Sequence, residues 1–273
     1  MKCRVKKYAI IIIILSIVFI ILGLNNNIVK TKYIIEDKRV QSNFKVIFIA
    51  DTHSCSYGEN QRELLDKVSE EKPDLILLGG DIIDDKLPMK VGLSTIKSLR
   101  EYAPTYYVTG NHEIWSGRHE MIKEKIKNLD IEVLEGNKDT LKIKGNEMVI
   151  AGIDDPDIGE EYYIQLENLK KLKSDKITFL LAHRPEKIDD YRKIDIDYVF
   201  SGHAHGGQWR IPLILEKGLY APNQGIFPKY TVGINKFDKF SLIVSRGLSR
   251  ESTRIPRFFN PPEIVIVNFK KGK

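Results

Sequence analysis

The sequence predicts an α/β domain preceded by one N-terminal membrane helix. From residue 44 onward, short apolar runs rich in β-branched and aromatic residues, which are typical of buried strands, alternate with stretches of helical periodicity. Residues 8–24 carry no charge and are nearly all Ile, Leu, Val and Phe. The chain has 273 residues, so the part beyond this segment lies within the length that one hydrophobic core can fill.

The apolar segment 8–24 is as long as a membrane-spanning helix, which needs roughly 17–25 residues. It is longer than the apolar core of most signal peptides, and Gly23-Leu24-Asn25 offers no small-residue cleavage site, so we expect an uncleaved signal anchor. Four basic residues lie in the tail 1–7. The positive-inside rule therefore predicts a single-pass protein of the cell membrane, with a cytoplasmic tail and an extracytoplasmic domain, although Lys30 and Lys32 weaken the charge asymmetry.

The positive charge of the chain does not indicate an anionic polymer as partner. The net charge is +6, but residues 1–32 supply six of the 43 basic residues and none of the 37 acidic ones. The remainder is neutral, so we expect the membrane as a partner and no specific nucleic-acid or protein partner. Cys3 and Cys55 lie on opposite sides of the membrane in this topology, which excludes a disulfide between them.

The elements beyond the helix follow one another without an internal repeat. Residues 25–43 are polar and Lys-bearing and are expected to be a linker, and residues 44–273 are expected to form the domain. Apolar runs predict strands at 46–50, 74–79, 105–109, 148–153, 177–181, 197–201, 240–244 and 263–269. Helical spacing of apolar residues predicts helices at 61–71, 90–101, 118–128 and 160–172.

Potential metal ligands directly follow five of these runs. The strings are Asp51-Thr52-His53, Gly80-Asp81, Gly110-Asn111-His112-Glu113, Ala182-His183-Arg184 and Gly202-His203-Ala204-His205. Loops at the C-terminal ends of strands gather at one edge of an α/β sheet, so we expect these side chains to meet. Carboxylate, imidazole and amide donors suit Mn2+, Fe2+, Zn2+ or Co2+. They are too many for one tetrahedral ion and predict two ions that share a carboxylate.

This ordered set of strings resembles the calcineurin-like metallophosphoesterase superfamily over about residues 44–269. The wider pattern, including Ala182-His183-Arg184-Pro185-Glu186 and the closing 257–263, is similar to the membrane-anchored bacterial phosphoesterases described as YkuE- or YaeI-like. The resemblance implies a four-layer α/β/β/α sandwich of two mixed sheets flanked by helices. Periodicity alone does not predict that arrangement.

The resemblance also implies roles for eight residues. Asp51, His53 and His205 would hold the first ion, Asn111, His183 and His203 the second, and Asp81 would bridge the two. Mn2+ is the ion we expect, with Fe2+, Zn2+ or Co2+ as alternatives. A hydroxide held between the ions would attack phosphorus, and His112 would stabilise the developing charge or protonate the leaving oxygen.

Each of these roles has a structural alternative. Asp51, Asp81 and Asn111 could be turn or helix-cap residues. His183 could be a half-buried core histidine, and His112 could only orient Asn111. Glu113 could orient His112 or a ligand, and Asp154 and Asp155 are explained equally by outer support of the site or by a turn at the end of a strand.

The resulting functional hypothesis is a membrane-anchored, two-metal hydrolase of a phosphodiester, phosphomonoester or pyrophosphate. Its position at the membrane favours a phospholipid, a lipid-linked phosphate or a wall polymer as substrate. Phe227, Tyr230, Phe237 and Phe240 could receive an acyl chain or belong to the core. The alternative function is a catalytically inactive, membrane-tethered metal-binding or scaffold protein.

Overall fold

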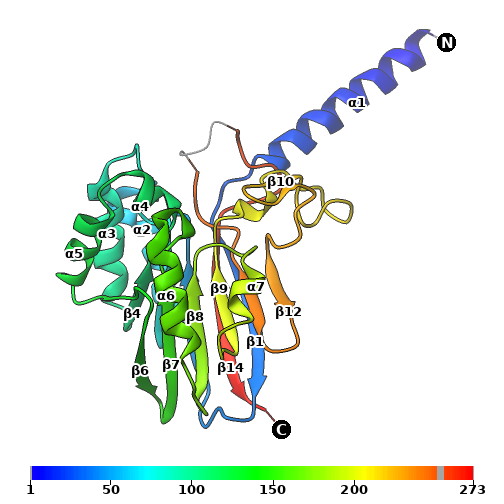
Figure 1. Cartoon of the computed structure of the whole chain (residues 1–273). Helices are drawn as coiled ribbons and strands as arrows, with labels where there is room; N and C mark the ends of the chain where they lie inside the picture. Colours follow the sequence, from blue (N-terminus) through cyan, green and yellow to red (C-terminus); the bar gives the residue numbers. More distant parts are fainter. Residues whose placement is uncertain (1, 251–254, 273) are drawn as a thin grey trace.

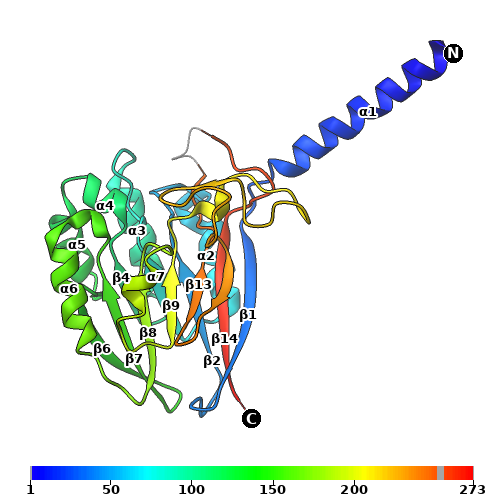
Figure 2. The same ribbon diagram turned by 45° about the vertical axis from the view of Figure 1, so that its right-hand side comes forward.

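A computed structural model of the chain describes residues 2–250 and 255–272. Two six-stranded sheets pack face to face, helices cover their outer faces, and one long helix, α1 (Lys2–Gly23), projects from the molecule (Figures 1 and 2). This is the four-layer α/β/β/α arrangement that the family resemblance implies.

The first sheet has the order β1-β14-β2-β3-β4-β5. Its strand β14 runs antiparallel to β2, whereas the other neighbours are parallel, so the sheet is mixed. Its strands are β1 (Val29–Asp37), β2 (Phe44–Ile49), β3 (Leu75–Gly79), β4 (Thr105–Val108), β5 (Glu132–Val133) and β14 (Glu263–Lys271).

The second sheet has the order β12-β13-β9-β8-β7-β6 and is mixed as well, because its two outer pairs are antiparallel. Its strands are β6 (Asn137–Ile143), β7 (Asn146–Ile153), β8 (Ile177–Ala182), β9 (Tyr198–Ser201), β12 (Gly233–Lys236) and β13 (Ser241–Val244). A small hairpin, β10 (Tyr220–Ala221) with β11 (Gly225–Ile226), lies outside both sheets.

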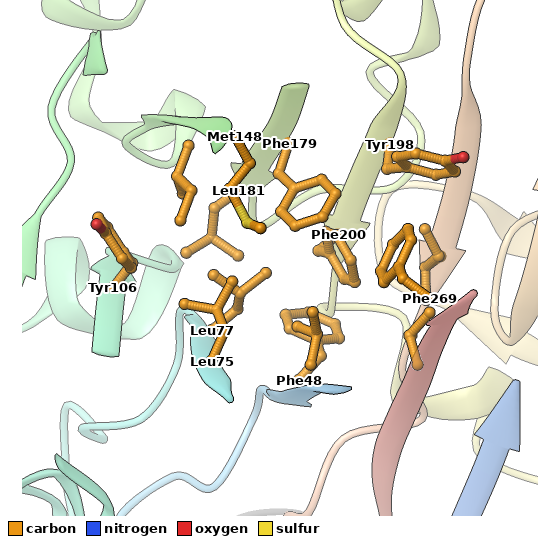
Figure 3. Packing of buried hydrophobic residues seen from close by; sticks show 14 of the residues in the cluster. Phe48, Leu75, Leu77, Tyr106, Met148, Phe179, Leu181, Tyr198, Phe200 and Phe269 are labelled. Atoms are coloured by element: carbon orange, nitrogen blue, oxygen red, sulfur yellow. The ribbon is translucent and has the colours of Figure 1, made fainter. Parts of the chain in front are cut away.

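Alternating side chains of the strands divide between the central layer and the outer faces. In β2, Phe48 points into the layer between the sheets, where it contacts Phe200 of β9 with ring centroids 5.5 Å apart, and Ile47 and Ile49 pack under the helices of the opposite face. Figure 3 shows this central layer, with Leu77 facing side chains of the other sheet such as Leu181. Both faces of each sheet are thus buried, as expected for strands that read as continuous apolar runs.

Helices complete the two outer layers. Three helices, α2 (Arg62–Glu71), α3 (Met89–Arg100) and α5 (His119–Lys127), cover the first sheet. The second sheet is covered by α6 (Glu160–Lys170) and α7 (Ile188–Tyr191). The short helix α4 (Asn111–Trp115) follows β4, and three single turns of 3-10 helix lie at Glu59–Gln61, Pro156–Ile158 and His205–Gly207. The four helices predicted from helical spacing are all present, within two residues at each end.

The helix α1 is separate from these layers. Its segment Lys6–Gly23 is long and apolar enough to cross a membrane and is the one such segment among the described residues. Most of its large apolar side chains are exposed. At its end, the Phe259 backbone N–H donates to the Gly23 carbonyl, 2.6 Å away, and Phe19 contacts Phe258 and Phe259 with ring centroids 5.6 and 4.8 Å apart. The helix therefore joins the domain through a defined contact.

The structure corrects the prediction of a linker over residues 25–43. Residues 29–37 form β1, which pairs in parallel with the whole length of β14. The prediction failed because β1 lies at the sheet edge, where Lys30, Lys32 and Ile34 face solvent or acidic side chains and the segment reads as polar. Only Tyr33 and Ile35 of this strand pack against the central layer.

Candidate metal centre

The predicted site residues gather at one edge of the sandwich. Asp51 and His53 follow β2, Asp81 follows β3, and Asn111 and His112 begin α4 directly after β4. From the second sheet, His183 follows β8, and His203 and His205 follow β9. All five strands end at this edge because they run parallel within their sheets. The site therefore spans both sheets.

Potential ligand atoms within this set lie within 4.8 Å of one another in three overlapping groups. The groups are Asp51 with His53 and His205, Asp81 with His183 and His203, and His53 with Asp81 and His112. The first two match the two ligand sets implied by the family resemblance, apart from Asn111. The Asp81 Oδ2 atom lies 3.6 Å from His53 Nε2 and 3.2 Å from His183 Nε2, between the two sets.

Four buried polar atoms of the site have no hydrogen-bond partner among the described residues. They are His53 Nε2, Asp81 Oδ2, Asn111 Oδ1 and His183 Nε2, of which Asp81 Oδ2 and His183 Nε2 form an ion pair 3.2 Å long without hydrogen-bond geometry. Leaving a buried polar atom without a partner costs roughly 1–3 kcal/mol, so several in one place call for a ligand. Two imidazole nitrogens and two oxygens are the donors that divalent transition metals bind. The residues present thus fit metal ions.

The backbone at the site is held in a conformation that side chains rarely adopt. Five of the seven candidate ligands have positive φ: Asp51 (52°), His53 (48°), Asp81 (50°), His203 (65°) and His205 (46°). Such residues are each disfavoured by about 1–3 kcal/mol and cluster at functional sites, where the surrounding structure enforces them. An N-cap residue has extended backbone, so these angles do not fit Asp51 and Asp81 as helix caps, whereas a turn residue can adopt them.

A glycine before Asp81 allows two of the loops to meet. Gly80 has φ +84°, and a Cβ atom at this position would lie 2.6 Å from the Gly110 backbone nitrogen and 2.8 Å from His183 Nδ1. Any side chain here would push apart the loops that carry Asp81, Asn111 and His183. These close approaches explain why a glycine precedes Asp81.

Each of the four histidines in the predicted ligand sets uses one ring nitrogen for a protein contact. His183 Nδ1 lies 2.7 Å from the Gly79 carbonyl oxygen, and His53 Nδ1 lies 3.1 Å from Asp84 Oδ2. His203 Nε2 lies 2.7 Å from Asn223 Oδ1, and the Ser249 hydroxyl lies 3.1 Å from His205 Nδ1. Contacts of this kind fix the ring orientation of metal-binding histidines and leave the other nitrogen for the ion. The sequence did not single out Asn223 or Ser249, because both are distant from the motifs and have ordinary surroundings.

Glu113 binds the backbone rather than a ligand side chain. Its carboxylate accepts hydrogen bonds from the N–H groups of Gly110 (2.8 Å), Asp81 (2.9 Å) and Ile83 (2.8 Å). The loop after β3 is thereby joined to the loop after β4. Glu113 therefore orients Asp81 through the backbone N–H of Asp81. Of the two roles predicted from the sequence, orienting a ligand agrees with this contact.

The buried acids and imidazoles of the site shift one another's pKa values. Burial disfavours ionised Asp81, but His183 and His53 outweigh this effect and hold the pKa of Asp81 well below its ordinary value. Burial lowers the pKa of His183, but Asp81 and Asp51 raise it to about 10. Burial and the neighbouring His183 lower the pKa of His203 to about 3, which keeps this imidazole neutral, the form that binds metals. Ionised Asp81 thus lies beside a protonated His183, while His203 stays neutral.

His112 is held differently from the other histidines. Its Nδ1 lies 2.6 Å from Asp85 Oδ1 and 3.4 Å from Asp84 Oδ2, and its ring is 18% exposed, whereas His53 and His183 are fully buried. Its backbone N–H donates to Asp81 Oδ1 at 2.8 Å. The His112 ring therefore lies at the open side of the site, where it can meet a substrate.

Asp154 and Asp155 lie outside the potential ligand groups and support the surrounding loops. Arg184 makes two hydrogen bonds to the Asp155 carboxylate, both 2.8 Å long, and the Thr109 hydroxyl donates to Asp154 Oδ1 at 2.6 Å. These buried contacts connect the ends of β4, β7 and β8. Asp155 also accepts the backbone N–H of Asp157 at 2.9 Å, as a turn residue at the end of a strand does, so both open interpretations agree with the contacts.

Comparisons with known proteins agree with this geometry. Residues 44–207 match the model of the calcineurin-like phosphoesterase family. An uncharacterized metallophosphoesterase, Cj0846 of Campylobacter jejuni, is 30% identical over 96% of this chain and 69% of its own length. Phosphodiesterase YaeI of Escherichia coli is 29% identical over 75% of each chain. Among solved structures, the NAD nucleotidase of Haemophilus influenzae has a similar fold, with a TM-score of 0.51 at 17% identity over 76% of this chain and 46% of that chain.

Proposed function

Because the chain belongs to the calcineurin-like phosphoesterase family of metal-dependent phosphoester hydrolases, we propose that it is a membrane-anchored phosphodiesterase with two divalent ions. The observation that supports this proposal is the convergence of four buried potential ligand atoms, from His53, Asp81, Asn111 and His183, that make no hydrogen bond. The name of the relative YaeI supports a diester as the substrate class. Monoesters and pyrophosphates are the alternatives that an assay must compare.

In this proposal, the candidate ligands divide as the family resemblance implies. Asp51, His53 and His205 hold one ion, Asn111, His183 and His203 hold the other, and Asp81 is shared. Mn2+ is the ion we propose to test first, and Fe2+, Zn2+ and Co2+ suit the same carboxylate, imidazole and amide donors. Such ions, when bound, lower the pKa of a coordinated water and polarise the phosphoryl oxygens.

The chain itself contributes proton transfer in this mechanism. The Asp85 carboxylate lies against His112 Nδ1, so the Nε2 atom of the ring is the one that can donate a proton to the leaving oxygen. Asp85 acts as a positioning residue, since it orients the ring and stabilises its positive charge. The partial exposure of His112 gives a substrate access to this atom.

The proposed substrate is a phosphoester at the membrane surface. The strand β1 begins at the edge where β2 ends, because β1 is parallel to β14 and β14 is antiparallel to β2. The end of α1, which leads into β1, therefore lies at the same edge as the candidate metal centre, as Figures 1 and 2 show. With α1 in a bilayer and the domain on the extracytoplasmic side, phospholipids and lipid-linked phosphates are the nearest phosphoesters. Efficient hydrolysis of nucleotides, with no hydrolysis of any lipid phosphoester, would contradict this choice.

The test uses the full chain in detergent, stripped of metal and then supplied with Mn2+, Zn2+, Fe2+ or Mg2+. We expect restored hydrolysis of bis-p-nitrophenyl phosphate, faster than that of p-nitrophenyl phosphate. Asp81→Asn is expected to lower both the number of bound ions and the activity. The matched control is Asp189→Asn, because the Asp189 side chain is 89% exposed and pairs with Arg192. Two bound ions per chain without turnover of any phosphoester would favour the inactive metal-binding protein.

A further inference from the structure

A group of exposed apolar side chains lies in the segment between the last candidate ligand and β12. We call it the apolar loop surface and define it by Trp209, Leu213, Ile214, Tyr220, Ile226 and Phe227. Leu213 is 92% exposed and Ile214 is 80% exposed, at the tip of a tight turn that is closed by the bridge between Ile211 and Leu215. Loop tips in water usually carry polar residues, so an apolar tip indicates a different environment.

The turn has a fixed shape despite its exposure. The N–H groups of Ile214 and Leu215 donate to the Ile211 carbonyl at 3.1 and 2.7 Å. Leu213 and Phe227, both bulky, have positive φ values of 68° and 56°. Such residues rarely adopt this conformation, and here it displays them outward. The exposure is therefore a property of an ordered loop.

This surface is continuous with the base of α1. Trp209 contacts Phe258, with ring centroids 6.1 Å apart, and Phe258 in turn contacts Phe19 of α1. Figures 1 and 2 both place the loops around β10 beside the end of α1. The exposed apolar side chains of α1 and of the loop thus form one connected region. A bilayer that surrounds α1 would reach the loop as well.

From this continuity we propose that the apolar loop surface is a second membrane contact, inserted into the bilayer interface beside α1. The occupant is the lipid, in the manner of proteins that bury an apolar surface in the headgroup and acyl boundary. Aromatic side chains such as Trp209 and Tyr220 are the residues that favour this boundary. Of the four aromatics considered for an acyl chain, only Phe227 belongs to this surface, because Tyr230, Phe237 and Phe240 pack in the core.

The contact would connect the membrane to the candidate metal centre. The Leu219 N–H donates to the carbonyls of Gly207 and Trp209 at 2.9 and 2.8 Å, which fixes the loop to the turn that contains His205. Insertion of the loop would therefore keep the edge that carries the site beside the membrane, with the site itself outside the bilayer. The inference rests on the membrane anchoring in the proposed function, and its test separates the two.

The test uses the two tryptophans of the chain, Trp115 and Trp209. Trp115 is 57% exposed and Trp209 is 44% exposed, so both are open to a quencher, but Trp115 lies on α4, away from α1 (Figure 1). The full chain is reconstituted into phosphatidylcholine vesicles with acyl chains brominated near the headgroup. We expect Trp209 emission to be lost in the Trp115→Phe variant. Trp115 emission should persist in Trp209→Phe.

Flotation with the vesicles reports on α1 independently. A chain that floats while its Trp209 emission persists would overturn the loop contact alone, whereas a chain that does not float would overturn the anchoring and this inference together. Leu213→Asp with Ile214→Asp should restore part of the Trp209 emission, while Ile164→Asp, a control in the exposed face of α6, should not. Unchanged quenching of Trp209 in the double variant would overturn the proposal. Trp209 emission that is protected from the quencher only when a vesicle holds several copies of the chain would overturn it as well.

Discussion

Among the five histidines of the site, His112 alone combines an acidic contact with an exposed ring edge. Its Nδ1 faces Asp85, and its ring stacks at an angle on Trp115, with centroids 4.9 Å apart. Of the four histidines in the predicted ligand sets, His53, His183 and His203 are buried. Each of the four has a partner on one ring nitrogen, which leaves the other nitrogen free. These different surroundings agree with the proposed roles, which are proton donor for His112 and metal ligand for the other four histidines.

His112→Ala is expected to lower kcat by about 10²–10⁴, the usual contribution of a general acid. The number of bound ions should stay unchanged, because neither of the two inferred ligand sets includes His112. The measurements are kcat on a phosphodiester and the metal content of the same sample.

His119→Ala provides the control for this substitution, since His119 lies on α5, outside the site, and pairs with Glu120. It should change neither quantity. If His112→Ala loses an ion, His112 is a ligand, and the proton must come from another group.

At this scale, the sequence predicted the ligand candidates but not the residues that hold them. Asp81 and His183 were found because each directly follows an apolar run, and strand ends converge in this fold. Asn223 lies 20 positions beyond its partner His203, in a loop without regular spacing. Nothing in its local sequence indicates that the chain folds back to the site.

One buried carboxylate at the end of α2, that of Glu71, links the edge strand β1 to α2 and to β2. Glu71 is 4% exposed and lies 2.9 Å from Lys30 and 2.8 Å from Lys32, both of β1, and 3.2 Å from Lys45 of β2. Burial alone would raise the pKa of Glu71, but these three ammonium groups outweigh it and lower the pKa to about 2. The carboxylate therefore stabilises the folded chain only in its charged form.

This pKa predicts an acid-dependent loss of stability. The folded pKa is about 2 and the ordinary value is 4.5, so the stabilisation is complete above pH 4.5 and is lost as the pH falls towards 2. Over that window, the free energy of unfolding should fall by up to about 3 kcal/mol more in the wild type than in Glu71→Gln. Denaturant unfolding at several pH values measures it. Glu70→Gln is the control, because Glu70 is exposed and binds only Lys30; an equal effect would contradict the role of Glu71.

Removal of β1 should weaken the first sheet. A chain that begins at residue 44 would expose the whole edge of β14 and part of the central layer under Tyr33 and Ile35. We expect it to be less stable than a chain that begins at residue 27 by several kcal/mol, about 1.5–3 for each buried side chain that is lost. Thermal unfolding of the two chains measures the difference, and equal melting temperatures would show that β1 is dispensable.

Whether an element could be predicted depended on where its stabilisation comes from. The helices α2, α3, α5 and α6 were predicted because their apolar residues repeat at helical spacing and face a sheet. The strand β1 is stabilised by backbone pairing with β14 and by ion pairs, so Lys30 and Lys32 concealed it. The two-sheet arrangement came from the family resemblance. The order of the strands within each sheet was not predicted, because spacing along the chain does not specify partners.

The candidate metal centre joins the two halves of the molecule. Asp51 and Asp81 come from the first sheet, whereas His183, His203 and His205 come from the second. Ions bound by both would stabilise the folded chain as ligands that bind only the native state, by about 4 kcal/mol when their concentration is a thousand times Kd.

We therefore expect the melting temperature to fall by several degrees on chelation and to recover when Mn2+ is added back. Asp81→Asn should melt at nearly the same temperature with and without the chelator, since the shared carboxylate is gone. A wild-type chain that is indifferent to chelation would contradict metal binding across the two sheets.

The parallel pairing of β1 with β14 also constrains when the molecule can form. Thr31 of β1 and Glu263 of β14 share a hydrogen bond although they lie 232 positions apart in the chain. Contacts this remote form late, because a long loop must close before they can be made. If α1 enters the membrane during synthesis, β1 stays beside the membrane as an unpaired strand until β14 has left the ribosome. An unpaired edge strand is a site where chains can pair wrongly or aggregate. It is therefore a segment that chaperones and proteases of nascent membrane proteins can recognise.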